Sequence, residues 1–202
     1  MIKKSEKLTK IRREPSRITT YDYIFKVVVF GDVGVGTSTL LKRTTSEFIY
    51  DTKLTIGVDF WVKKKTKGVD FREKVLEVEG RTVKLLILRL SAEERFKYLL
   101  PKYVKAAHGA ILMYDITRPA TLEKIPEWTS IVRTHVGAIP IVLVGGKADL
   151  VENREVSSEE ALEITKSGGL DAFIECDSKT GKNIEKLFET LTKLMLQRSD
   201  FY

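Results

Sequence analysis

The stretch Phe25–Leu40, FKVVVFGDVGVGTSTL, decides the fold of this chain. A continuous apolar run is followed by a glycine-rich turn and then by small hydroxyl residues that open a helical pattern. This order predicts a buried strand, a tight loop and a helix. Because the backbone N–H groups of such a loop converge near the positive end of the helix dipole, the arrangement is typical of a phosphate-binding site.

The loop GDVGVGTS, residues 31–38, fits the phosphate-binding pattern GxxxxGK[ST] at every fixed position except one. Thr37 stands where the pattern has lysine, so the loop keeps its backbone donors but lacks the charge that reaches the β- and γ-phosphates. The residues that we predict to line a phosphate site are Gly31, Asp32, Gly34, Gly36, Thr37, Ser38 and Thr39. A glycine-rich turn that binds nothing is the alternative, and the loop alone does not decide between them.

Length and composition favour one compact domain, since the chain has 202 residues and 43% of them are hydrophobic. No apolar run is long enough to cross a bilayer, and the lysine-rich N-terminus lacks the apolar stretch of a secretory signal peptide. The single cysteine, Cys176, fits a reducing compartment. We therefore expect a soluble, cytoplasmic protein.

The net charge of +7 is concentrated in two segments. Residues 1–17 carry seven Lys/Arg against two Glu, and residues 61–74 carry six Lys/Arg against one Asp and one Glu. This distribution favours contact of these segments with an acidic protein or membrane surface, and we expect no nucleic-acid binding. A solvated tail and a solvated hairpin are the alternative.

Apolar runs and helical patterns alternate from residue 23 to residue 198. Strands are predicted at residues 25–30, 75–78, 83–90, 110–114, 139–144 and 172–176. Helices are predicted at residues 38–48, 98–107, 121–135 and 183–197, with one more opened by a capping box at Ser157 and Glu160 and ended by Gly168. This alternation predicts an α/β domain with a doubly wound, mostly parallel sheet, helices on both faces and a ligand site at the carboxyl ends of the strands. Residues 1–22 form a basic tail outside this domain.

The segment before residue 77 contains a near-repeat, because TIGVDFWVKKK (55–65) is followed at once by TKGVDFREKVL (66–76). An 11-residue tandem duplication accounts for it. We predict an extended hairpin at the sheet edge, in which an insert of about residues 64–74 either lengthens the hairpin or bulges out as a basic loop. Only one copy can hold the functional register, and the first lies nearer to the phosphate loop. Which copy occupies the switch position stays open.

These ordered motifs resemble the Ras superfamily of small GTPases, most closely its Rab-like branch, over residues 24–197. TIGVDF is similar to the first switch, with Thr55 in the place of the magnesium-binding threonine, and residues 94–96 (ERF) are similar to the end of the second switch. Four further motifs follow in the family's order, YDIT (114–117), IPIVLVG (139–145), KAD (147–149) and KTGKN (179–183).

The resemblance implies the P-loop small-GTPase fold, with GTP or GDP as cofactor and Mg²⁺ held by Ser38 and Thr55. Beside the loop residues, it implies nucleotide contacts from Thr55, Ala92, Lys147, Asp149, Ser178 and Lys179. It also implies a monomer that binds a protein effector or regulator. The chain printed here ends in QRSDFY without a cysteine, so we expect no prenylation.

Six positions depart from the family pattern, and all six bear on nucleotide or magnesium. Thr37 replaces a lysine, Arg89 an aspartate, Ala92 a glycine, Glu93 a glutamine, Gly146 an asparagine and Asp177 a serine. Arg89 removes an acid that helps to hold magnesium, although its cation could neutralise a phosphate or pair with Glu93 or Asp32. Glu93 stands at the position of the water-orienting glutamine, but an ionised carboxylate cannot donate a hydrogen bond. No catalytic residue of the pattern is intact.

The departures favour a degenerate GTPase, a pseudoGTPase with weakened guanine-nucleotide binding and little hydrolysis that acts as a protein-interaction or signalling and trafficking module. Two other hypotheses stay open. One is a working molecular switch that hydrolyses GTP to GDP with atypical chemistry, and the other is a basic protein that sits peripherally on acidic membranes.

Overall fold

The computed structural model describes residues 20–44, 46–47, 69–90 and 100–199. Its strands are β1 (Tyr23–Gly31), β2 (Ser46–Glu47), β3 (Val69–Val78), β4 (Arg81–Leu90), β5 (Gly109–Asp115), β6 (Ile141–Gly146) and β7 (Ala172–Glu175). They form one seven-stranded sheet in the order β2-β3-β4-β1-β5-β6-β7. Strands β4, β1, β5, β6 and β7 run parallel, whereas β3 is antiparallel to both β4 and β2. The prediction of a mostly parallel sheet is confirmed.

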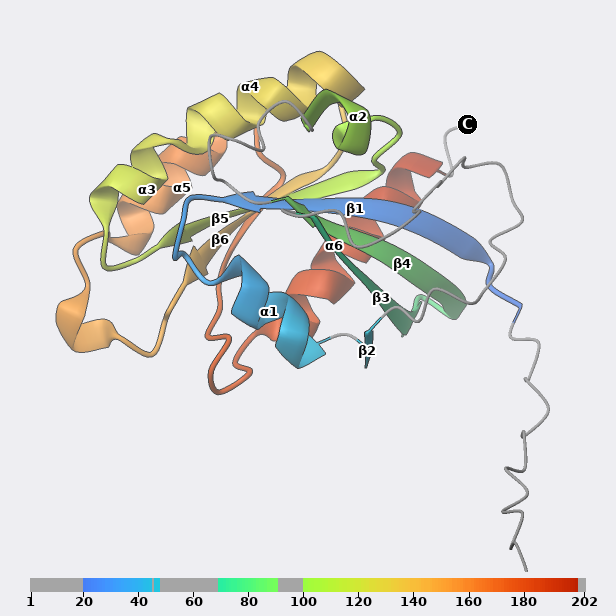
Figure 1. The fold of residues 1–202 in the computed structure, drawn as a ribbon, viewed down its shortest axis with the longest axis horizontal. Helices are drawn as coiled ribbons and strands as arrows, with labels where there is room; N and C mark the ends of the chain where they lie inside the picture. The colour runs from blue at the N-terminus through green and yellow to red at the C-terminus, as the bar shows by residue number, and fades with distance from the viewer. Residues whose placement is uncertain (1–19, 45, 48–68, 91–99, 200–202) are drawn as a thin grey trace, which may run out of the picture.

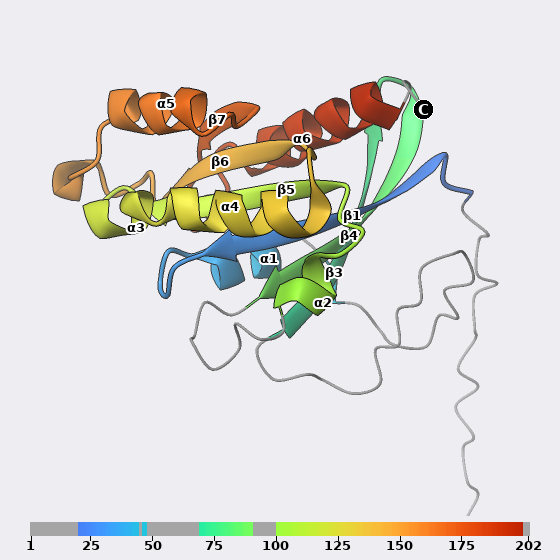
Figure 2. The ribbon, with the colours of Figure 1, turned by 90° about the horizontal axis from the view of Figure 1, so that it is seen from above.

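The helices lie on both faces of this sheet, as predicted for a doubly wound fold (Figure 1). They are α1 (Thr37–Thr44), α2 (Leu100–Val104), α3 (Pro119–Glu123), α4 (Ile125–Val136), α5 (Ser158–Ser167) and α6 (Ile184–Ser199). Helices α1 and α6 cover one face, and α2 to α5 cover the other. Figure 2 shows α4 running beside β5 and β1.

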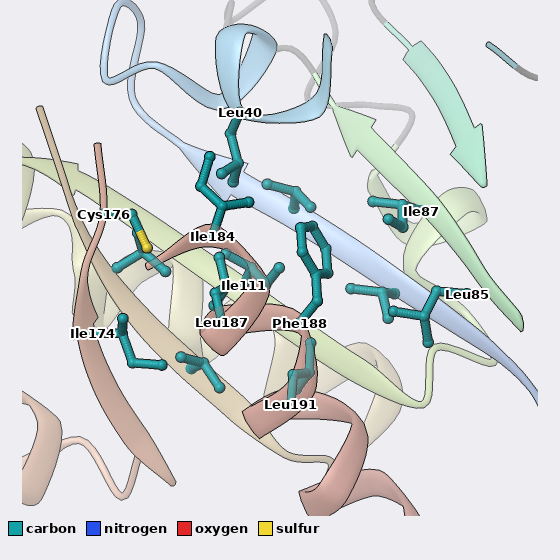
Figure 3. Close-up of a cluster of buried hydrophobic side chains, with 14 of the residues drawn as sticks. Leu40, Leu85, Ile87, Ile111, Ile174, Cys176, Ile184, Leu187, Phe188 and Leu191 are labelled. Atoms are coloured by element: carbon teal, nitrogen blue, oxygen red, sulfur yellow. The ribbon is translucent and has the colours of Figure 1, made fainter. Parts of the chain in front are cut away.

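Each face has its own apolar core. Figure 3 shows Leu187, Phe188 and Leu191 of α6 pointing toward Ile111 of β5 and Leu85 of β4. All five side chains are fully buried, so the helix predicted over residues 183–197 packs an apolar stripe against the sheet. On the other face, the ring of Phe30 in β1 stacks on Trp128 of α4 with centroids 5.4 Å apart. These two cores fix the sheet against α1 on one face and α4 on the other.

Strand β3 begins at Val69, six residues before the predicted start at Val75, and the second copy of the repeat supplies all of it except Glu77 and Val78. Val69 is 7% exposed and pairs with Leu90 of β4. Lys74 donates from Nζ to Glu185 of α6 at 2.9 Å. Over residues 69–74 the insert therefore lengthens the hairpin and does not form a basic loop, because pairing with β4 offsets the low strand propensity of its charged residues. Residues 64–68 lie outside the described residues.

Two helix predictions change in detail. Helix α1 ends at Thr44 rather than at residue 48, and β2 follows at once. The single helix predicted over residues 121–135 is two helices, α3 and α4, which meet at Lys124. Pro126 lies in the first turn of α4, where its missing N–H costs no helical hydrogen bond. The predicted capping box is confirmed, since Ser157 Oγ accepts from the backbone N–H of Glu160 at 3.2 Å and the Glu160 carboxylate accepts from the backbone N–H of Ser157 at 2.7 Å.

Candidate nucleotide site

The glycine-rich loop joins the carboxyl end of β1 to α1, at the sheet edge where ligands bind in such folds. Gly34 and Gly36 have φ angles of 80° and 106°, in the left-handed region that glycine adopts without strain. A Cβ on Gly31 would lie 2.5 Å from the carbonyl oxygen of Met113, so only glycine fits against β5. The loop therefore has the backbone that a phosphate cradle requires.

The side chains of this loop contribute hydroxyl groups and no cation. Thr37 is the first residue of α1 and only 8% of it is exposed. Ser38 is half-buried and Thr39 is exposed in the same turn. An anion in this loop would thus meet backbone N–H groups and the positive end of the α1 dipole, but no lysine.

Two basic side chains hold the outside of the loop. Lys124 donates from Nζ to Asp32 at 2.7 Å, and Arg118 donates from Nη2 to the carbonyl oxygen of Val33 at 2.9 Å. Partial burial alone would raise the pKa of Asp32, but the hydrogen bonds from Lys124 and from the N–H of Val33 outweigh it and lower the pKa. Sequence reasoning missed both cations, because no motif links α3 to a loop more than eighty residues earlier.

Asp115, at the end of β5, has a fully buried side chain whose carboxylate accepts hydrogen bonds from several neighbouring side chains. It accepts from Lys147 Nζ at 2.6 Å, from Arg118 Nε at 3.0 Å and from Thr117 Oγ1 at 2.7 Å. Burial alone would raise the pKa of Asp115, but these hydrogen bonds lower it, so the carboxylate stays ionised. Lys147, which we predicted as a base contact, is thereby held at the edge of the site by a partner that the sequence did not reveal.

The loops that would meet a base come from the ends of β6 and β7. Asp149 is exposed, and within the described part of the chain its carboxylate has no hydrogen bond or ion pair. The carboxylate of Asp177 accepts from the backbone N–H groups of Lys179 at 2.7 Å and Thr180 at 2.8 Å, which closes the second loop. Arg43 of α1 donates to the carbonyl oxygen of Thr180 at 2.8 Å and ties this loop to α1. Asp149 therefore remains available to a ligand.

Ser178 and Lys179 differ in their surroundings. Ser178 is 8% exposed, and its Oγ has no hydrogen-bond partner among the described residues. Lys179 is exposed in the same loop. The structure thus brings Asp149 and Lys179 to the surface of this edge and encloses Ser178.

Gly146, at the end of β6, lies directly against the phosphate loop. A Cβ on this residue would stand 2.8 Å from the carbonyl oxygen of Val35, and it would also overlap the terminal methyl group of Met113. The asparagine of the family pattern is therefore replaced here by a close backbone approach. The two loops therefore touch although position 146 has no side chain to join them.

Arg89 of β4 forms an ion pair with Asp70 of β3, the residue directly opposite it in the sheet. Arg89 Nε donates to Asp70 Oδ2 at 2.7 Å, and the two side chains are 18% and 44% exposed. We predicted Glu93, Asp32 or a phosphate as the partner of this cation. The suggestion of Asp32 is wrong, because that carboxylate binds Lys124, whereas Glu93 lies outside the described residues.

The described residues include part of the predicted magnesium site. Over residues 20–44, 46–47, 69–90 and 100–199, no three His, Cys, Asp or Glu side chains gather where they could hold a metal ion. Ser38 is present at the start of α1, whereas Thr55, Ala92 and Glu93 lie outside the described residues. Among the described residues, Ser38 keeps the hydroxyl that the resemblance assigns to Mg²⁺, whereas Arg89 places a cation at the position of the family's acid.

A mostly parallel sheet, a glycine-rich loop after its first strand and an exposed acid after β6 define a P-loop nucleotide-binding protein. The family model of the Ras family matches residues 26–197, so this chain belongs to the Ras family of small GTPases. Its relatives place it on the Rab-like branch.

The similarity to these relatives extends over most of the chain. This chain is 41% identical to Ras-related protein RABA2a of Arabidopsis thaliana over 173 residues, which is 85% of this chain and 74% of that protein. It is 33% identical to human Ras-related protein Rab-19 over 183 residues, 90% of this chain and 80% of that protein. It is 39% identical to Ras-related protein YPTC6 of Chlamydomonas reinhardtii over 173 residues, 85% of this chain and 74% of that protein.

Proposed function

We propose that this Rab-like protein is a degenerate GTPase, which binds guanine nucleotide weakly, hydrolyses GTP slowly or not at all, and acts mainly as a protein-interaction module. The observation that carries this proposal is the ion pair between Arg89 and Asp70. A cation fixed by an acid at this position opposes a magnesium ion. Magnesium supplies much of the charge stabilisation in phosphoryl transfer, so its loss weakens hydrolysis most.

The residues for the nucleotide itself are largely retained. The backbone of residues 34–38 would bind its phosphates, and Asp149 would accept hydrogen bonds from the N–H groups of guanine. The phosphates would supply the negative charge that the N-terminus of α1 attracts. Thr37 cannot replace the lysine, and losing one charged hydrogen bond costs roughly 1.5 to 3 kcal/mol. Weak binding with guanine preference is therefore the expected balance.

A working switch with atypical chemistry is the second candidate. It is favoured by the left-handed φ angles of Gly34 and Gly36 and by the carboxylate of Asp149, which has no partner among the described residues, since both features suit a bound nucleotide. The two candidates differ in turnover. A degenerate GTPase lacks the charges that stabilise the transition state, whereas a switch must complete hydrolysis.

Single-turnover hydrolysis of GTP in Mg²⁺ by the full chain separates these candidates. We expect a rate no higher than that of the buffer control. The double variant Thr37→Lys, Arg89→Asp should bind GTP more tightly, which would show that these two departures from the family pattern cause the weak binding of GTP. Hydrolysis by the unmodified chain at the rate of an ordinary Rab protein would reject the degenerate reading in favour of the switch.

Titration with labelled GDP tests whether the site prefers guanine nucleotides and whether binding depends on Mg²⁺. We expect GDP to bind more tightly than ADP and with the same affinity in Mg²⁺ and in EDTA. Asp149→Ala should remove the preference for GDP, and Glu152→Ala, on the exposed turn that follows, serves as the matched control. Equal affinity for GDP and ADP would contradict the preference for guanine. A large loss of affinity in EDTA would contradict the proposal that nucleotide binding does not depend on Mg²⁺.

We also propose that the basic residues 1–17 and Lys63–Lys67 make a charged contact surface for an acidic membrane or protein partner, and that the protein is cytoplasmic with this peripheral contact. Their charge supports the proposal, since these residues are strongly basic whereas the rest of the chain is nearly balanced. Lys74 no longer belongs to the surface, because it pairs with Glu185. No helix of the described residues is long and apolar enough to cross a membrane.

A further inference from the structure

We propose that Arg118 is a positioning residue for the phosphate loop, which holds the loop in the shape that receives an anion and partly compensates for the missing lysine. This inference rests on the proposed nucleotide binding. It assigns to the site a residue from the turn between β5 and α3, where we predicted no contact with the nucleotide.

The guanidinium group of Arg118 lies against the outside of the loop at Val33 and Gly34. Its Nη2 donates to the carbonyl oxygen of Val33 at 2.9 Å. A Cβ built on Gly34 would stand 3.6 Å from the same nitrogen, so the guanidinium lies beside the Gly34 backbone. A Cβ at that distance would be in ordinary van der Waals contact with the guanidinium, so glycine is favoured at this position by its φ angle of 80° and not by Arg118.

The hydrogen bond to Val33 sets the direction of the next N–H group. The carbonyl of Val33 and the N–H of Gly34 belong to one planar trans peptide, so they point in opposite directions. When Arg118 holds the carbonyl on the outside of the loop, the Gly34 N–H is turned toward the inside, where an anion would lie. Arg118 therefore acts on an anion through the loop backbone and need not touch it.

Arg118 is itself held in place by a buried acid. Its Nε donates to Asp115 Oδ2 at 3.0 Å, and the side chain of Asp115 is fully buried. Lys147 donates to the same carboxylate oxygen at 2.6 Å. A guanidinium group can donate to Asp115 and Val33 at the same time because its N–H groups form a rigid fork, whereas a lysine offers a single nitrogen.

The charges near the loop also favour an anion. Arg118, Lys124 and Lys147 are positive, and they share two carboxylates, those of Asp32 and Asp115. The cluster therefore carries one unit of excess positive charge. Arg89 cannot contribute to this role while it is paired with Asp70 on the other side of β1.

The experiment compares the unmodified full chain with Arg118→Gln, Arg118→Lys and the matched control Arg198→Gln. Arg198 pairs with Asp171, and it also donates to the carbonyl of Ala138, before β6. Affinities are measured for GDP, inorganic diphosphate and guanosine, and the backbone amide signal of Gly34 is followed by NMR during the diphosphate titration.

We expect Arg118→Gln to weaken binding of GDP and diphosphate by about tenfold, the size of one lost charged hydrogen bond. Binding of guanosine should stay unchanged, because guanosine has no phosphate. Arg118→Lys should recover only part of the loss, and Arg198→Gln should bind all three ligands normally. The Gly34 amide signal should shift on titration in the unmodified chain and shift less in Arg118→Gln.

The results also separate this inference from the proposed function. Unchanged diphosphate binding by Arg118→Gln, or an equal loss of guanosine binding, would overturn the role of Arg118. Full recovery of binding by Arg118→Lys would show that Arg118 acts through its charge and not by positioning the loop backbone. If the unmodified chain binds diphosphate but GDP no better than ADP, the guanine function fails and the role of Arg118 stands. If it binds neither GDP nor diphosphate, both proposals are overturned.

Discussion

The terminal methyl group of Met113 occupies the space that a side chain on residue 146 would need, so the glycine at position 146 and the methionine at position 113 fit together. The same methyl would stand 3.3 Å from a Cβ on Gly36 of the phosphate loop. Met113 is fully buried in the core that α1 and α6 cover. An apolar contact thus joins β5 to both loops at the point where the family pattern has a polar side chain.

Restoring the asparagine should therefore destabilise the protein. Gly146→Asn should lower the free energy of unfolding by about 1 to 3 kcal/mol, because the added atoms overlap Met113 and the carbonyl of Val35. Met113→Val alone should cost about 1 kcal/mol through lost packing. Combining the two should cost less than their sum, as a double-mutant cycle in urea would measure. Strict additivity would show that Met113 does not fill this space.

Arg89 should control the response to magnesium. In the unmodified chain we expect the same melting temperature in Mg²⁺ and in EDTA. Arg89→Asp places a second carboxylate beside Asp70, and a cation relieves the repulsion, so Mg²⁺ should raise the melting temperature of this variant. Asp70→Asn is the control, because it leaves Arg89 in place and should create no response to magnesium. If Mg²⁺ raises the melting temperature of the unmodified chain, the ion pair between Arg89 and Asp70 does not take the place of the metal.

Lys26 should make stability depend on alkaline pH. Lys26 in β1 is 5% exposed, its Nζ donates to the carbonyl oxygen of Lys105 at 2.7 Å, and burial lowers its pKa from 10.5 to about 8. Between these two pKa values the unfolded chain binds more protons than the folded chain, so the free energy of unfolding rises with pH. The gain from pH 8 to pH 10.5 should approach 3 kcal/mol relative to Lys26→Met.

Urea unfolding of both proteins at several pH values measures this gain, because other lysines and tyrosines cancel in the difference. The pKa of the neighbouring His108 is lowered by burial and by the charge of Lys26, so this histidine titrates below the window. A difference between the two proteins that does not change with pH would refute the buried titration of Lys26.

The basic segments should give salt-sensitive binding to anionic vesicles. Clustered Lys and Arg add roughly 1 kcal/mol each near an anionic surface, and screening acts over about 8 Å at physiological salt. Deleting residues 1–17, or changing Lys63, Lys64, Lys65 and Lys67 to Gln, should reduce co-sedimentation at low salt. Lys74→Gln should not, because Lys74 contacts α6. If none of these changes matters, the segments are solvated or serve a protein partner.

Local patterns made much of the fold predictable. The apolar runs of β1, β5 and β6, the stripe of α6 and the capping box of Ser157 and Glu160 each depend on neighbours a few residues apart. Strand β3 escaped prediction over residues 69–74, because its charged residues become a strand only by pairing with β4. The break between α3 and α4 was not predicted either, although Pro126 in the first turn of α4 is a signal for the start of a helix.

The sequence by itself determined the sheet architecture, the phosphate loop and the positions at which this chain departs from the Ras family, because each of these is written in spacing along the chain. Only the tertiary structure decided the partners of the charged residues. Arg89 binds Asp70 rather than Asp32, and Arg118 reaches Val33 from 85 positions away. The physical reason is that ion pairs depend on distances across strands and between loops, and folding sets those distances only after the sheet has brought its carboxyl ends together.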